Sequence, residues 1–287
     1  IESDAEHVNH FTVTGRSLES ILERRIIWKQ TILSGNFQNG IKKLLDENII
    51  NPSDASRKVE RLIFEASTDP AITGLTVDAQ FTGDNLYDAI KKLCDSKNIG
   101  FRIKLSDDNK FVFKLYAGED HSYDQFTNPY VIFSPKFENV INTNYLESKK
   151  TLKTVTLVAG EGEGADRKTT TVACSSGAGT GLNRRELYTD ARDVSSTVDN
   201  ETLTDSEYKA QLSQRGLENL SENIATKSFE GKVETTRMYR YGEDFFLGDM
   251  VQIVNEYGIE GKSRVTEFIR SQSKEGLDSY PTFVTVE

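Results

Sequence analysis

A chain of 287 residues is longer than one small domain, and the usual domain size predicts about two domains. Hydrophobic residues make up only 36% of it, so the apolar material must lie in thin layers, as in a β-barrel or a small α/β sandwich. The net charge of −10 excludes a broad nucleic-acid surface, because duplex binding depends on Lys and Arg neutralising phosphates.

The first predicted element is a strand that turns sharply into a helix, over residues 11–27. The turn falls at Gly15 and Arg16, and Ser17 is a plausible N-cap. The helix has one apolar stripe with helical spacing, formed by Leu18, Ile21, Leu22, Arg25 and Ile26. A second helix is predicted over 36–47, with a buried face formed by Phe37, Ile41, Leu44 and Leu45, and it is ended by Asn48 and Pro52.

A compact α/β unit is predicted between residues 58 and 116. Two strands flank a turn at Asp69-Pro70, a helix capped by Asp84 follows, and a hairpin completes the unit. The order β-β-α-β-β predicts a small sheet with a helix packed on one face. The strands are expected at 62–64, 75–81, 101–105 and 111–116.

The second half of the chain is predicted to be rich in β-structure around one helix. Residues 160–164 read as a hairpin tip or mobile loop, and 175–202 as the most flexible stretch. Thr204 caps a helix that runs to about Thr226. Further strands are expected at 131–133, 140–141, 154–158, 229–241, 250–254, 262–271 and 280–287.

The two cysteines predict neither a disulfide framework nor a zinc site. Cys94 and Cys174 each lack a CxxC partner, and Cys94 lies on the apolar face of a predicted helix. No run approaches the ~18 apolar residues of a membrane helix, so we expect no stable membrane insertion. No signal peptide is visible. The chain begins without methionine and closes on a strand-like segment, so we expect it to be part of a longer polypeptide.

No motif in the sequence predicts catalytic, cofactor-binding or metal-binding residues. His7 and His10 precede a strand and lack the intervening glutamate of an HExxH zinc site. The glycine clusters at 160–164 and 177–181 lack the Gly-Lys-Ser/Thr of a phosphate-binding loop. No Gly-x-Ser-x-Gly elbow occurs. We therefore expect no enzymatic activity and no cofactor.

The 45 carboxylates leave one enzymatic alternative open. Asp69, Asp78, Asp84 and Asp249 lie near strand ends, and a glycosidase needs two carboxylates facing one cleft. Their positions fit turns and helix caps better. A cell-wall (peptidoglycan) hydrolase or a carbohydrate-binding module remains the alternative function. A cleft with paired carboxylates or exposed stacked aromatic rings would favour it.

Two short segments resemble the tail-hub proteins of long-tailed bacteriophages, a family that includes the structural N-terminal part of siphophage tail-associated lysins. The first is Gly15-Arg16-Ser17-Leu18, where the family's strand-to-helix element commonly has Asp in place of Ser17. The second contains Gly248 and Asp249 and resembles the family's last β-domain. The turn near Gly258 and residues 264–267 extend that resemblance.

The resemblance implies an α+β, β-rich fold with two tube-like β-barrel domains, an α/β insertion and a helical segment. It implies a structural baseplate or tail-tip hub in the virion, assembled as a homotrimeric ring of six barrels. The implied partners are further copies of the chain, the tail tube and distal tail proteins, with DNA passing through the channel without specific binding. The helix after Ser17 would cover a face of its barrel.

The resemblance and the periodicities together predict five segments. They are 1–35 (first barrel element), 36–129 (α/β insertion), 130–174 (β-segments linking the barrels), 175–227 (loop and helix) and 228–287 (C-terminal barrel meander).

Overall fold

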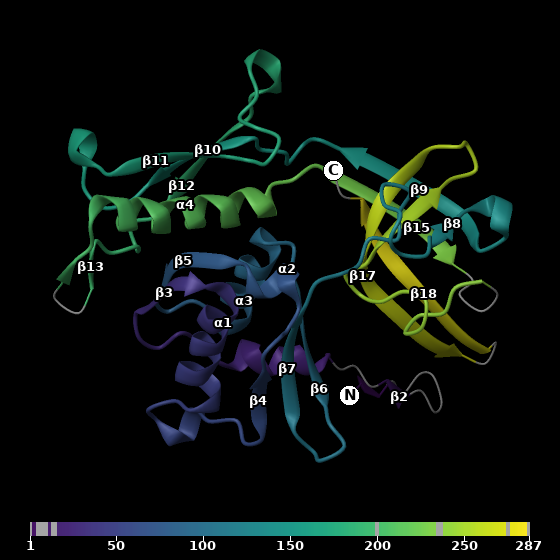
Figure 1. Ribbon diagram of the computed structural model, residues 1–287, viewed down its shortest axis with the longest axis horizontal. Coiled ribbons are helices and arrows are strands. Elements are labelled where there is room, and N and C mark those ends of the chain that lie inside the picture. Colours follow the sequence, from purple (N-terminus) through teal and green to yellow (C-terminus); the bar gives the residue numbers. More distant parts are fainter. Residues whose placement is uncertain are drawn as a thin grey trace.

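The computed structural model describes residues 2–3, 11–12, 16–198, 201–233, 238–273 and 276–285. These residues form a mixed α+β protein rich in strands, which confirms the predicted class (Figure 1). Buried apolar side chains gather in three separate clusters, one for each main unit of the fold. In this part of the chain no helix is both long and apolar enough to cross a membrane.

The first unit is an α/β unit with two small sheets. In one sheet β3 pairs antiparallel with β5; in the other, β7 pairs parallel with β4 and antiparallel with β6. A separate strand pair, β1 (Glu2–Ser3) with β2 (Phe11–Thr12), precedes this unit in the chain. In chain order the elements of the unit are η1 (Leu18–Arg24), β3 (Thr31–Asn36), α1 (Phe37–Leu45), η2 (Asp46–Ile50), η3 (Ala55–Arg57), β4 (Leu62–Glu65), α2 (Pro70–Thr73), β5 (Thr76–Phe81), α3 (Leu86–Ser96), β6 (Gly100–Leu105) and β7 (Phe111–Tyr116).

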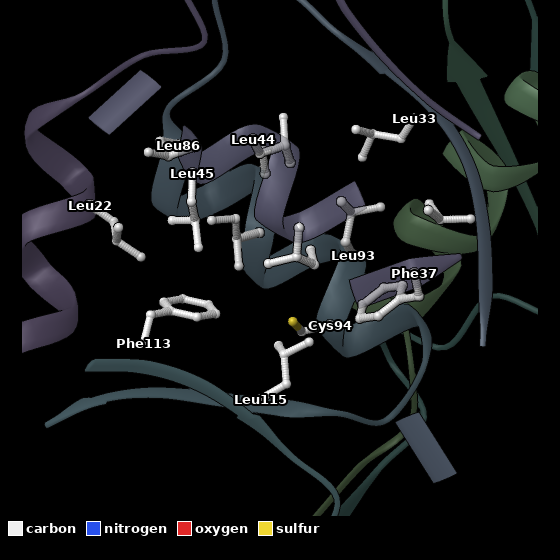
Figure 2. Close-up of a cluster of buried hydrophobic side chains, with 14 of the residues drawn as sticks. Leu22, Leu33, Phe37, Leu44, Leu45, Leu86, Leu93, Cys94, Phe113 and Leu115 are labelled. Carbon is white, nitrogen blue, oxygen red and sulfur yellow. The ribbon is translucent and has the colours of Figure 1, made fainter. Parts of the chain in front are cut away.

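The core of this unit forms where the apolar faces of α1 and α3 meet strand β7 (Figure 2). Its buried side chains include Leu44 and Leu45 of α1, Leu93 and Cys94 of α3, and Phe113 of β7. The faces predicted for both helices are confirmed. Burial raises the pKa of the Cys94 thiol, so Cys94 acts as the small buried apolar residue that the sequence predicts.

The second unit is a three-stranded sheet covered on one face by helix α4. The sheet has β10 (Val155–Ala159) at its centre, antiparallel to β11 (Thr169–Ala173) and parallel to β12 (Glu186–Asp190). Helix α4 (Asp205–Glu222) packs closely on it: a Cβ at Gly216 would lie 2.8 Å from Val158 Cγ2. The predicted cap is confirmed, because Thr204 Oγ1 accepts from the Glu207 N–H at 3.3 Å. Short elements complete the unit: η5 (Gly164–Asp166), η6 (Gly181–Asn183), β13 (Thr197–Val198) and β14 (Glu201–Thr202).

Helix α4 also contacts the α/β unit, through polar side chains (Figure 1). The Gln80 side chain of β5 approaches Gln211 of α4 at 3.4 Å and accepts from the Ser195 N–H at 2.7 Å. Gln214 Nε2 donates to Ser96 Oγ of α3 at 3.2 Å. This interface is therefore held by directional hydrogen bonds, whereas the opposite face of α4 is held by apolar packing.

The third unit is a six-stranded sheet with the order β8-β16-β17-β18-β15-β9. Its core is aromatic: the Phe133 ring lies 5.6 Å from Phe245 and 5.2 Å from Phe283, measured between ring centroids. Its elements are β8 (Ile132–Phe133), η4 (Pro135–Phe137), β9 (Val140–Ser148), β15 (Thr226–Val233), β16 (Met250–Val254), β17 (Glu260–Ser273) and β18 (Gly276–Thr285). Within the described ranges this sheet is open, with β8 and β9 at its edges.

Several predictions for individual elements are wrong. The strands of the α/β unit do not share one sheet, because β5 pairs with β3, which the pattern did not predict, and β4 joins the hairpin β6–β7. The cap of α3 is Asn85 and not Asp84, since the Asn85 side chain accepts from the Tyr87 and Asp88 amides. The stretch predicted to be flexible contains β12. Helix α4 ends at Glu222, four residues before Thr226.

Candidate functional site

Gly248 and Asp249 lie where the linker after β7 crosses the turn that leads into β16. Gly248 has φ = +93°, a left-handed conformation that favours glycine. A Cβ on Gly118 of the linker would lie 1.8 Å from the Gly248 carbonyl oxygen, so only glycine at 118 permits this crossing. The crossing joins the α/β unit to the six-stranded sheet. We call it the 118/248 junction.

The Asp249 carboxylate connects both backbones of the 118/248 junction. It is 3% exposed, its Oδ1 accepts from the Glu119 N–H at 2.8 Å, and its Oδ2 accepts from the Phe246 N–H at 2.7 Å. Burial raises the pKa of Asp249, while these two N–H donors counteract that rise. Two backbone bonds, between Asp249 and Val265 and between Gly248 and Val265, attach the turn to β17. Both carboxylate oxygens are thus used to hold structure.

Asp249→Asn is expected to lower the free energy of unfolding by about 2 kcal/mol. The amide group of asparagine would turn one N–H donor toward another, leaving the Glu119 or Phe246 amide buried and unpaired. Urea unfolding followed by circular dichroism measures this loss. Asp244→Asn is the matched control, because the Asp244 carboxylate also accepts a backbone amide, from Arg240, but on an exposed turn. Equal losses for the two variants would contradict the role given to Asp249.

A pocket of about 390 Å³ lies beside the 118/248 junction. The His121 ring reaches into this region: Nδ1 is 2.8 Å from the Pro129 carbonyl oxygen, and Nε2 is 3.6 Å from Asp249 Oδ2 and 3.9 Å from Glu119 Oε2. Glu119 and Asp249 are both in the lining, but Asp249 is already committed to two backbone amides. This arrangement favours a structural joint over a pair of free catalytic carboxylates. The described residues contain no group of three or more His, Cys, Asp or Glu placed to hold a metal ion.

The N-terminal motif packs against the core of the α/β unit, whereas Gly248 and Asp249 lie at the six-stranded sheet. Gly15 lies outside the described residues, as do His7 and His10. Arg16 forms an ion pair with Glu23, and Ser17 occupies the N-cap position without a side-chain capping bond. Leu18 is half-buried against the core of the α/β unit.

The helix predicted after Ser17 is a 3-10 helix, η1, which ends at Arg24. Contacts with distant parts of the chain explain the difference. The Ile103 N–H donates to the Glu19 carboxylate at 2.6 Å, and Arg25 Nε donates to the Arg57 carbonyl at 2.7 Å. Leu22 is buried in the α/β core, so η1 covers that unit and not the six-stranded sheet.

The C-terminal motif contains Gly248 and Asp249 but gives no sign of the residues that meet them. Gly118, Glu119 and His121 follow the predicted strand 111–116 in a linker that carries no sequence motif, and His121 stands alone there without a second histidine nearby. Gly118, two residues after that strand, was an available signal, because glycine permits close backbone approach. Nothing in the sequence pairs it with a glycine 130 positions later.

The fold resembles that of a solved prophage tail protein. The 43 kDa tail protein of prophage MuSo2 from Shewanella oneidensis has a TM-score of 0.53 at 13% identity, covering 94% of this chain and 73% of that one. Prophage tail protein gp18 from Listeria monocytogenes has a TM-score of 0.47 at 14% identity, with 92% and 68% covered. A tail protein from Neisseria meningitidis gives 0.47 at 14% identity, with 93% and 72% covered. Of these three structures, only the Shewanella protein has a TM-score above 0.5, so the likeness of fold is drawn from it.

Sequence comparison gives the family. No curated protein sequence matches the chain. The profile of the family described as Siphovirus ReqiPepy6 Gp37-like protein matches residues 1–283. Because that match spans nearly the whole chain, the chain belongs to the Siphovirus ReqiPepy6 Gp37-like family, which confirms the predicted identity as a protein of a siphovirus or prophage tail.

Proposed function

We propose that this chain is a structural hub protein of the tail tip, which assembles as a homotrimeric ring between the tail tube and the distal tail proteins. In this role the chain acts by assembly and not by catalysis. The family membership supports a place in the tail, and the organisation of the six-stranded sheet supports the ring.

The observation that carries the proposal is the long edge strand of that sheet, β9. Strand β9 extends from Val140 to Ser148, and within the described residues it pairs only with β15. A long unpaired edge is a template for another chain, and soluble proteins normally shorten it or cover it. A neighbouring chain in a ring would cover it specifically. One head-to-tail interface, repeated around a threefold axis, closes such a ring without leaving an edge.

The proposed ring contains two tube-wall elements from each copy. The six-stranded sheet is the first, and the sheet of β10, β11 and β12 with its helix α4 is the second. The two β-barrels that the resemblance implies would form only when neighbouring chains complete these open sheets. The boundaries at residues 35, 129, 174 and 227 stay a prediction, although the proposal gives the second wall element to β10, β11 and β12 in place of residues 1–35.

The net charge of −10 fits a channel through which DNA passes. An acidic wall offers phosphates no cluster of Lys and Arg, so the DNA would not be held at a specific site. This part of the proposal requires acidic side chains to face the axis of the ring.

Cryo-electron microscopy of tail tips from the phage or prophage that encodes the chain tests the proposal. We expect three copies in a central ring at the end of the tail tube, with β9 of each copy next to a sheet of its neighbour. Isolated chain at micromolar concentration serves as the comparison, and it is expected to be monomeric if the tube acts as template. Finding the chain only in a peripheral appendage, in another copy number or absent from the particle would refute the hub.

A further inference from the structure

Residues 121–131 form a compact surface loop whose two ends are joined. The Val131 N–H donates to the His121 carbonyl at 3.0 Å, and the His121 N–H donates to the Met250 carbonyl of β16 at 2.7 Å. A loop of this length with closed ends, packed by its own side chains, is an Ω-loop, and such loops frequently carry function. We call residues 121–131 the Ω-loop.

The side chain of Gln125 holds the Ω-loop from within. Its Oε1 accepts from the Thr127 N–H at 2.7 Å and the Asn128 N–H at 2.6 Å. Its Nε2 donates to the Ser122 carbonyl at 3.2 Å and the Asn128 carbonyl at 3.0 Å. Because one side chain satisfies four backbone groups, the Ω-loop is ordered before any partner binds, and little conformational entropy is left to lose on binding.

This ordered loop displays Phe126 to solvent. The Phe126 side chain is 92% exposed, although its neighbour Gln125 is fully engaged. In the same loop Tyr123 and Tyr130 are 43% and 40% exposed, and their rings meet edge to face with centroids 5.7 Å apart. Exposed phenylalanine does not stabilise this fold, but a rigidly presented aromatic ring is the kind of residue that dominates binding energy in protein interfaces.

Acidic residues lie within the Ω-loop and directly before it in the chain. The carboxylates of Asp120 and Asp124 lie 3.4 Å and 3.2 Å from Lys262 Nζ, which they share. Asp124 remains 71% exposed in its side chain and Glu119 69% exposed. Two aspartates on one lysine, with Glu119 nearby, leave the area around the Ω-loop net negative. The complementary surface is basic, and an anionic membrane would be repelled.

We propose that the Ω-loop is a docking element that inserts Phe126 into an apolar pocket with a Lys- and Arg-rich rim on a different tail protein. The proposal deepens the hub function and rests on it, since the partner is taken to be a neighbour in the particle. Phe126 is the anchor, Tyr123 and Tyr130 widen the contact, and Gln125 keeps the Ω-loop in its binding conformation.

Complementation of a phage lacking the gene tests the anchor. Phe126→Ala is expected to reduce the number of tailed particles at least about tenfold, as for the loss of a binding hot spot. The purified variant should keep the wild-type Tm, because the removed ring packs on nothing. Leu182→Ala is the matched control: Leu182 is 99% exposed, but it lies in η6 beside a glycine cluster, away from the Ω-loop. Its particle count should stay at the wild-type level.

Photo-cross-linking identifies what Phe126 contacts. A benzophenone amino acid at position 126 keeps an aromatic ring, so particles should form, and irradiation should link the chain to another tail protein beside Lys or Arg residues. The same probe at position 182 should give no such product. Vesicles of phosphatidylglycerol provide the membrane comparison, and the wild-type chain should not sediment with them.

Each other result overturns the docking proposal. These results are equal particle counts for Phe126→Ala and Leu182→Ala, a cross-link to a second copy of this chain or to lipid, no cross-link at position 126, or sedimentation with vesicles. The hub function fails separately, if the wild-type chain is absent from the particle. If wild-type and Phe126→Ala chains are incorporated into particles equally well, the hub function stands and only the docking role of the Ω-loop is refuted.

Discussion

Gly118→Ala is expected to lower the free energy of unfolding by about 3 kcal/mol, among the largest effects of any single methyl group in this chain. The new Cβ would lie 1.8 Å from the Gly248 carbonyl oxygen and 2.6 Å from the Asp249 amide nitrogen, and both are backbone atoms that cannot turn aside. Separating the two backbones would stretch the bonds from the Met250 N–H to the Glu119 carbonyl and from the Glu119 N–H to Asp249 Oδ1, each now 2.8 Å.

Urea unfolding measures this effect, and Gly74→Ala is its matched control. Gly74 has φ = −82°, and its added Cβ would meet only the Pro70 carbonyl oxygen, at 3.3 Å. We expect the control to change the free energy of unfolding by less than about 1 kcal/mol. Separation of the two backbones at the 118/248 junction should also increase hydrogen exchange at the Met250 amide in Gly118→Ala. A Gly118→Ala protein as stable as Gly74→Ala would contradict the close approach at the 118/248 junction.

Glu218→Gln is expected to stabilise the protein by about 3 kcal/mol at pH 8 and by almost nothing at pH 4. Burial raises the pKa of Glu218 from 4.5 to about 7, more than Arg215 and Gln214 lower it. A carboxyl whose pKa is higher in the folded than in the unfolded chain takes up protons on folding. The destabilisation of the fold by the buried, ionised Glu218 is therefore absent below pH 4.5, grows between pH 4.5 and 7, and is complete above pH 7.

Charged and polar groups from helix α4 and from the α/β unit act on the Glu218 carboxyl. Arg215 Nε lies 3.6 Å from Glu218 Oε2, Gln214 Nε2 donates to Oε1 at 3.2 Å, and Lys92 and Asp84 act from the α/β side. Glutamine keeps the size and the acceptor for Gln214. In Glu218→Gln, Arg215 keeps its ion pair with Asp193, whose Oδ2 is 2.9 Å from Arg215 Nη2. The loss of the ion pair with Arg215 is thus smaller than the relief of burying a charge.

Thermal unfolding between pH 4 and 8 measures the slope, with Glu222→Gln as the control. Glu222 lies one turn further along α4, pairs with Lys92 at 3.5 Å and is 46% exposed in its side chain. Its removal should leave the pH dependence of Tm unchanged, whereas Glu218→Gln should flatten the decline between pH 4.5 and 7. A wild-type protein with constant Tm across that range would show that Glu218 is ionised in the fold at no cost.

Some of this fold could be predicted because the signals are local. The apolar faces of α1 and α3 follow helical spacing, and their residues, Ile41 and Leu93 among them, are buried as expected. Thr204 and Glu207 are three residues apart, so the capping box of α4 is visible in the sequence. The alternation after Ser228 likewise predicted the strands β16, β17 and β18. Each of these features depends on residues that lie within a single helix or strand or directly beside it.

Other predictions failed where neighbours distant in sequence decide the outcome. Asp84 and Asn85 are both good caps, and Asn85 takes the role because its amide group also donates to the Glu23 carbonyl at 2.9 Å. The segment after Ser17 has helical spacing, but contacts with Ile103 and Arg57 shorten it to a 3-10 helix. The stretch 175–202 is polar and has clustered glycines, which predicts flexibility, but β12 within it is ordered by pairing with the parallel strand β10, and no hairpin signal marks that pairing in the sequence.

The sequence by itself determined the class, the main helices, the β-rich C-terminal part and the family, because periodicity, caps and motifs lie within short segments. It also gave Gly248 and Asp249 as residues to examine. Only the tertiary structure decided what they do. Asp249 is 130 residues from Glu119 and Gly248 is 130 residues from Gly118, and a one-dimensional pattern carries no information about which distant backbones cross. Burial, which sets the Asp249 and Glu218 carboxyls apart from the other acidic residues whose exposure the structure describes, is likewise a property of the packed chain.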